Sequence, residues 1–129
     1  MCLYSIDKKT KNWKVGYKVF KKYGKERVKT PIYPHIYKLN TWVKDKTKIY
    51  LRSIKDREKY ESGFHFFKNK RDAVIYNRVS NEIVLKIKVR NLIVTGTSKI
   101  NNYNRFKSWK NRPVLTGVAK EMFIIMEDN

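Results

Sequence analysis

Three side chains have the chemistry to take part in a reaction: the thiol of Cys2, the imidazole of His65 and the carboxylate of Glu121. A thiol beside a general base is a known nucleophile. Removal of the first methionine would leave Cys2 with an adjacent amine, and His65 would be the base if the fold brings the two together. Alternatively, Cys2 is a small apolar side chain at the start of a strand. We favour this packing role and assign no catalytic residue.

His65 lies in the sequence Gly-Phe-His-Phe-Phe at positions 63–67, which predicts a short aromatic strand. On a strand, His65 and Phe67 share one face, while Phe64 and Phe66 share the other. A histidine among aromatic side chains is usually a hydrogen-bonded packing residue. Because a helix is expected to begin just after this strand, His65 could instead orient an anionic ligand or stack on a base.

Metal and cofactor sites have little support in the sequence. His35, His65 and the single cysteine lack the paired spacing that zinc sites need. Gly16 and Gly24 are eight residues apart in lysine-rich sequence and do not form a phosphate-cradling loop. We therefore expect no metal ion and no cofactor, and we favour a binding protein over an enzyme. Carboxylate pairs for acid–base chemistry are conceivable only among Glu58, Glu61, Asp72 and Glu121.

The charge balance is the most informative property of the chain. Its 129 residues include 31 Lys and Arg but only 11 Asp and Glu, which gives a net charge of +20. Such a charge repels itself in the folded state, so a polyanionic partner is expected. AT-rich codon usage would enrich lysine and asparagine without any partner, but it does not explain the scarcity of acids. Nucleic acid or a ribonucleoprotein is the expected partner; a solvated basic surface and an acidic protein are the alternatives.

One segment, residues 99–112, interleaves five basic residues with three aromatic ones and contains no acid. Basic residues contact phosphates, and aromatic rings give stacking platforms for unpaired bases. The spacing of Tyr103, Phe106 and Trp109 also fits an amphipathic helix that packs on a core. The predicted nucleic-acid-binding residues are Lys86, Lys88, Arg90, Lys99, Tyr103, Arg105, Phe106, Lys107, Trp109, Lys110 and Arg112.

The elements that must position these residues follow from periodicity. Residues 13–20 alternate with period two, which predicts a strand whose odd positions face the core and whose Lys14 and Lys18 lie outside. Ile83, Leu85 and Ile87 mark the clearest strand, with Lys86 and its neighbours on the other face. Asn69 is expected to cap a helix with Ala73 on its inner face, and residues 52–60 form a short exposed helix or a loop. Further strands are predicted at 63–67, 114–119 and 122–126.

This order predicts an α+β fold, a small and mostly antiparallel sheet with one or two short helices. We expect a single domain over residues 1–129, because the length fits one core and no linker or repeat is visible.

Five short motifs carry a resemblance to known proteins. They are Met-Cys-Leu at 1–3, Gly-Tyr-Lys-Val-Phe at 16–20, Gly-Phe-His-Phe-Phe at 63–67 before Asp72-Ala73, Val-Arg-Asn at 89–91 with Thr95-Gly96, and Val-Ala-Lys-Glu-Met at 118–122. In this order they resemble a family of small, mostly uncharacterised accessory proteins of phages and large DNA viruses. The resemblance implies a viral accessory protein, acting in host takeover or against host defence, as anti-CRISPR proteins do. It brings no assigned activity.

A second likeness concerns the order strand, Gly-Phe-His-Phe-Phe strand, helix and strand. This order is loosely similar to the core of ADP-ribosyltransferase-like folds, where such elements help to form the nicotinamide pocket. The resemblance implies a small nucleotide-handling enzyme in which Glu121 stands for the late catalytic glutamate. No His-Gly-Thr or Arg entry motif is present, so this enzyme is the alternative to a binding protein.

The expected compartment is intracellular. No apolar run approaches the roughly 20 residues that span a bilayer, and the start lacks the pattern of a signal peptide. Cys2 is the only cysteine, which suits a reducing compartment. With the viral resemblance, we expect the host cytoplasm or nucleoid, or association with a virion.

Overall fold

Long antiparallel strands dominate the chain. The computed structural model describes residues 3–30, 35–76, 82–100 and 112–126. Strands make up 58% of the structure and helix 6%, so the fold is β-rich and the predicted α+β class is wrong. The helix α1 (Lys70–Tyr76) is a small attachment to the sheet. The strands are β1 (Ser5–Ile6), β2 (Val15–Lys22), β3 (Arg27–Lys29), β4 (Ile36–Lys38), β5 (Trp42–Lys44), β6 (Tyr50–Arg52), β7 (Lys59–Glu61), β8 (Phe64–Phe67), β9 (Glu82–Ile100) and β10 (Arg112–Ile124).

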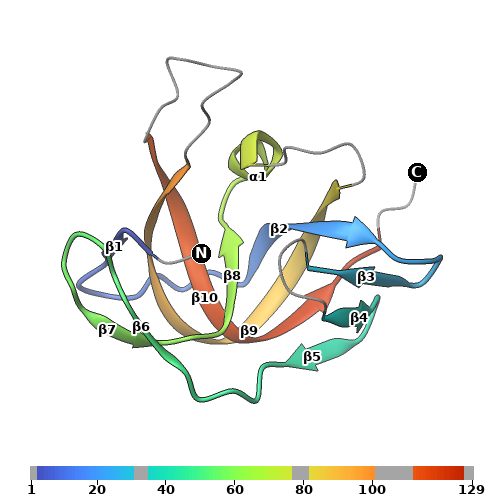
Figure 1. Cartoon of the computed structure of the whole chain (residues 1–129), viewed down its shortest axis with the longest axis horizontal. Coiled ribbons are helices and arrows are strands. Elements are labelled where there is room, and N and C mark those ends of the chain that lie inside the picture. The colour runs from blue at the N-terminus through green and yellow to red at the C-terminus, as the bar shows by residue number, and fades with distance from the viewer. Residues whose placement is uncertain (1–2, 31–34, 77–81, 101–111, 127–129) are drawn as a thin grey trace.

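The hairpin of β9 and β10 is the centre of the fold (Figure 1). The two strands pair along most of their length; β1 and β2 also pair with β9, and β5 and β8 also pair with β10. The register shifts between Val118 and Ala119, and nearby Asn91 has a left-handed φ of 55°. A β-bulge of this kind bends a strand and increases its twist. The two closing strands predicted at 114–119 and 122–126 are therefore one bent strand, β10.

Four strands close a ring of hydrogen-bonded pairs. β2 pairs with β9, β9 with β10, β10 with β8, and β8 with β2. The ring of Phe66 lies against Gly16 and Gly117, where a Cβ atom on either glycine would collide with it. Phe66 is 1% exposed, and it packs with Ile87 and Met122 in the main core. Glycines therefore let the backbones of β2 and β10, the two strands that pair with β8, approach the Phe66 ring.

β2 is covered on both faces, which corrects one prediction. Val19 of the odd face packs with Phe67 and Ala73 under α1, whereas Phe20 of the even face lies in the main core. Lys18 shares the even face, and its Nζ donates a hydrogen bond to the His65 carbonyl at 2.7 Å. Lys18 is thus directed inward, not outward as the alternation suggested, because both faces of this strand are buried.

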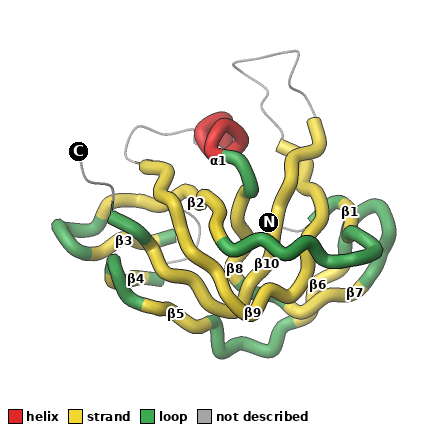
Figure 2. Tube along the Cα trace, turned by 180° about the vertical axis from the view of Figure 1, so that it is seen from behind, coloured by secondary structure: helices red, strands yellow, loops and turns green. Residues whose placement is uncertain are grey.

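Smaller units complete the two ends of the molecule. β3, β4 and β5 lie one above the other at one end, and the β6–β7 hairpin lies at the other (Figure 1). This hairpin occupies the region predicted as a short helix or a loop, residues 52–60. The loop that leads from β1 to β2 follows β9, with the Val89 amide donating to the Lys14 carbonyl (Figure 2).

Candidate nucleic-acid interface

The predicted alternation of β9 is confirmed. Leu85, Ile87 and Val89 are at most 5% exposed, while the side chains between and after them point to solvent. These outward residues are Lys86, Lys88 and Arg90. β9 therefore presents three of the predicted binding residues as a row of cations on one face.

Neighbouring strands extend this row of cations. Lys88 is opposite Phe123 of β10, and Phe123 is opposite Trp42 of β5. Residues directly opposite each other in an antiparallel pair project from the same face of the sheet. A second row runs from Arg90 through Glu121 to Lys44. We call this surface the cation–aromatic face; it comprises Trp42, Lys44, Lys86, Lys88, Arg90 and Phe123, with Glu121 in the middle.

Arg90 has a fixed position on the cation–aromatic face. Its guanidinium lies over the ring of Trp42, 3.9 Å from the centroid, and its Nη2 is 3.1 Å from Oε1 of Glu121. Phe123 meets Trp42 edge to face at 5.7 Å, and the Lys88 ammonium is 5.6 Å from the centroid of the Phe123 ring. Trp42 remains 36% exposed. Cations and aromatic rings are thus interleaved here, as in a surface that contacts both phosphates and bases.

Glu121 acts as the partner of Arg90 in this arrangement. The hydrogen bond from Arg90 is the main cause that lowers the pKa of Glu121. The side-chain amide of Asn91 also donates to this carboxylate. The carboxylate is therefore ionised at neutral pH and occupied on both oxygens. These hydrogen bonds orient Arg90, and a carboxylate held in this way is not a proton donor.

His65, the other candidate of the described chain, is held as a packing residue. Its Nδ1 is 3.3 Å from the Gly63 carbonyl, so Nε2 accepts from the hydroxyl of Tyr60 at 3.1 Å. That hydroxyl in turn accepts a hydrogen bond from the Leu3 amide at 2.9 Å. Burial, and then the nearby charge of Lys18, lower the pKa of His65 to about 3. The ring is neutral near pH 7, a poor base, and it ties the N-terminal segment to β8.

Lys18 was not expected as a notable residue. Burial lowers the pKa of Lys18 to about 8. Its ammonium donates to the His65 backbone carbonyl, which, unlike a carboxylate, does not balance the positive charge. The sequence signal for this position was present, since Lys18 lies two residues from both Gly16 and Phe20 on one face of a strand. The lysines at 14 and 18, however, favour a solvent-exposed face in the sequence.

The remaining predicted residues are not part of the cation–aromatic face. Lys99 lies farther along β9, exposed, with its ammonium 4.1 Å from the centroid of the Tyr4 ring. Arg112 begins β10. Residues outside the described ranges are Cys2 and, in the 99–112 segment, Tyr103, Arg105, Phe106, Lys107, Trp109 and Lys110.

Sequence reasoning missed Trp42, Lys44 and Phe123. Trp42 and Lys44 belong to a strand of three residues, too short for a periodic signal. Phe123 lies within an apolar run in which no single side chain stands out as exposed. Only the register of β5 on β10 brings these residues to Arg90 and Lys88.

Within the described ranges, no cluster of three or more His, Cys, Asp or Glu side chains could hold a metal ion. In that same part of the chain, no helix has the length and apolarity that a bilayer crossing requires. Comparisons with known proteins found no matching family model, no matching curated protein and no matching solved structure.

Proposed function

We propose that this chain is a non-enzymatic binding protein whose cation–aromatic face contacts unpaired nucleic acid, either free or within a ribonucleoprotein. The observation that carries the proposal is the stack of Arg90 on Trp42 among exposed lysines. An arginine that lies over an indole keeps those of its N–H donors that are not bound to Glu121 available to phosphate oxygens or base edges.

Charge supports phosphate contact. Lys44, Lys86 and Lys88 are exposed beside Arg90, and Glu121 is the one acid of this face, already paired with Arg90. Each phosphate that a lysine neutralises releases condensed counterions, which makes the binding of nucleic acid favourable at low salt. The net charge of +20 adds long-range attraction for any polyanion.

The aromatic side chains favour unpaired bases over a duplex. Bases inside a duplex stack on each other and offer no free face to a protein ring, whereas single strands do. Trp42 is partly exposed and is braced by Phe123. A base can extend the Arg90–Trp42 stack or replace Arg90 over the ring.

An acidic protein could pair with the lysines, but it has no bases that would stack on Trp42. For the nucleotide-handling enzyme, both described candidates have packing or orienting roles, since His65 is neutral and bonded to Tyr60 and Glu121 is paired with Arg90. An accessory role in a virus, in host takeover or against host defence, rests on the sequence resemblance alone.

The test compares single-stranded and duplex oligonucleotides of equal length by fluorescence anisotropy. We expect tighter binding of the single strand, and we expect Trp42→Ala to remove that preference. Equal affinity for both forms in the wild-type protein, or tighter binding of an acidic polypeptide than of either, would refute the proposal.

A further inference from the structure

A second basic surface lies on β2, β3 and β4. Lys21 is directly opposite Lys29, and Arg27 is directly opposite Lys38. Between Arg27 and Lys29, Val28 is 2% exposed and points into the core. The four cations therefore project from the outer side of these strands. We call this surface the basic sheet face.

Like charges directly opposite each other in an antiparallel pair are destabilising. Lys21 has Glu82 opposite it on its other side, in β9. In the described part of the chain, neither Arg27 nor Lys38 forms an ion pair, and both are exposed. The pair of Arg27 and Lys38 thus lacks a compensating anion, and a bound anion would relieve its repulsion.

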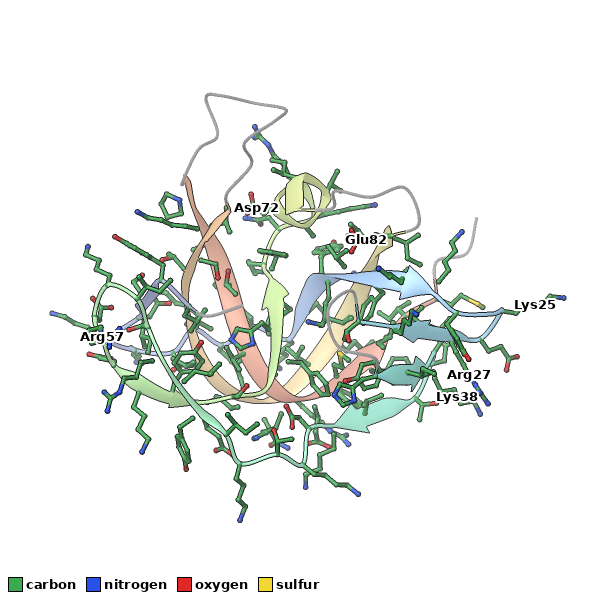
Figure 3. All side chains as sticks on the ribbon, viewed as in Figure 1. Lys25, Arg27, Lys38, Arg57, Asp72 and Glu82 are labelled. Carbon is green, nitrogen blue, oxygen red and sulfur yellow. The ribbon has the colours of Figure 1, made fainter. Side chains whose placement is uncertain are left out.

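The basic sheet face adjoins the cation–aromatic face along the chain. Only residues 39–41 separate Lys38 at the end of β4 from Trp42 at the start of β5. The Asn40 amide donates to the Ile124 carbonyl, which fixes this turn beside the end of β10. Arg27 and Lys38 lie close together with Lys25 at one end of the molecule, while Arg57 lies at the opposite end (Figure 3).

We propose that the basic sheet face is a second phosphate-contacting surface, and that one nucleic-acid strand continues onto it from the cation–aromatic face across the β4–β5 turn. The inference rests on the proposed function. Its ligand is the phosphodiester backbone, because the Arg27–Lys38 pair offers charge for phosphates, while the aromatic stack that would hold a base lies at Trp42. Contact here is independent of sequence.

The test uses two variants that each remove one like-charge pair. Arg27→Gln/Lys38→Gln changes the basic sheet face. Arg52→Gln/Lys59→Gln is the matched control, since these residues are also cross-strand partners but belong to the β6–β7 hairpin at the far end. Each double variant lowers the net charge by the same amount. Each is titrated with a short single strand of about 5 nucleotides and a long one of about 20 nucleotides.

We expect Arg27→Gln/Lys38→Gln to weaken binding of the long strand by roughly 10–30-fold at 0.1 M salt, as the loss of two phosphate contacts implies. Binding of the short strand should not change, because the cation–aromatic face alone holds it. The control should retain the affinity of the wild-type protein for the long strand within about threefold, since only long-range attraction is lost.

Equal weakening by both double variants would show a general charge effect and would overturn the inference, as would unchanged binding of the long strand by Arg27→Gln/Lys38→Gln. In either case, retained binding of the short strand leaves the proposed function standing. Failure of the wild-type protein to bind the short strand would refute the proposed function itself.

The melting temperature of Arg27→Gln/Lys38→Gln at low salt should equal or exceed that of the wild-type protein, because a repulsion is removed. A lower melting temperature would contradict the repulsion between Arg27 and Lys38.

Discussion

The guanidinium of Arg90 lies 3.9 Å from the centroid of the Trp42 ring, although the two residues belong to strands that do not pair with each other. β10 lies between those strands and supplies Glu121, which binds Arg90, and Phe123, which packs on Trp42. A stack that two further side chains hold in place loses little conformational entropy when it binds a ligand. This preorganisation makes Trp42 and Arg90 the centre of the predictions below.

Replacing Trp42 by alanine should weaken binding of a single strand by roughly 1–3 kcal/mol without changing the slope of log affinity against log salt, because stacking is lost and no phosphate contact is lost. Tyr50→Ala is the matched control, since Tyr50 is 55% exposed and also carries a cation, Lys59, 4.5 Å from its ring centroid. Anisotropy titrations at several salt concentrations measure both quantities. An equal loss in the two variants would argue against a specific role for Trp42.

Glu121→Gln separates the binding protein from the enzyme. In a binding protein, removal of this carboxylate from a basic face should strengthen the affinity for nucleic acid severalfold, because a charge that repels phosphate is lost. Stability should change little, as for other ion pairs near the surface. Release of nicotinamide from NAD by the wild-type protein, abolished in Glu121→Gln, would instead establish the enzyme.

Lys18→Met tests the inward position of Lys18. In the unfolded chain this lysine keeps its proton up to about pH 10.5, whereas in the folded chain it keeps it only up to about pH 8. The protonated form therefore destabilises the fold fully below pH 8, and this penalty disappears as the pH rises from 8 to 10.5. The shift corresponds to about 3 kcal/mol, and the lost hydrogen bond to the His65 carbonyl offsets about 1 kcal/mol. We expect Lys18→Met to stabilise the protein by about 2 kcal/mol at pH 7.

Urea denaturation at pH 7 and at pH 10 measures this effect. The advantage of Lys18→Met over the wild-type protein should shrink at the higher pH, and Lys22→Met, at an exposed position of the same strand, should show no such dependence. A destabilised Lys18→Met variant at pH 7 would mean that the ammonium contributes more through its hydrogen bond than burial costs.

The sequence was sufficient to predict elements in which buried and exposed residues alternate over many positions. β9 has buried Leu85 and Ile87 alternating with exposed Lys86 and Lys88, so both its existence and its outer face were predictable. The short strand around His65 was predictable from its run of aromatic residues, and the packing role favoured for that histidine agrees with its hydrogen bond to Tyr60.

Elements whose structure depends on distant partners were not predictable. α1 covers one face of β2, and the main core covers the other. The alternation of residues along β2 therefore does not reveal where Lys18 points. The α+β prediction rested on the short helix expected after Asn69, whereas the extent of β9 and β10, which makes the fold β-rich, comes from their pairing with each other. Trp42 joins the site only through the register of β5 on β10.

The most direct test of the cation–aromatic face is the salt dependence of single-strand binding by the wild-type protein and by Lys86→Gln/Lys88→Gln. The logarithm of the affinity should fall linearly with the logarithm of the salt concentration, by about 0.7 for each phosphate neutralised. The variant should reduce the magnitude of this slope by about 1.4, because two phosphate contacts are lost. Arg52→Gln/Lys59→Gln should keep the wild-type slope. An affinity that does not depend on salt, or a slope that Lys86→Gln/Lys88→Gln leaves unchanged, would contradict nucleic-acid binding at this face.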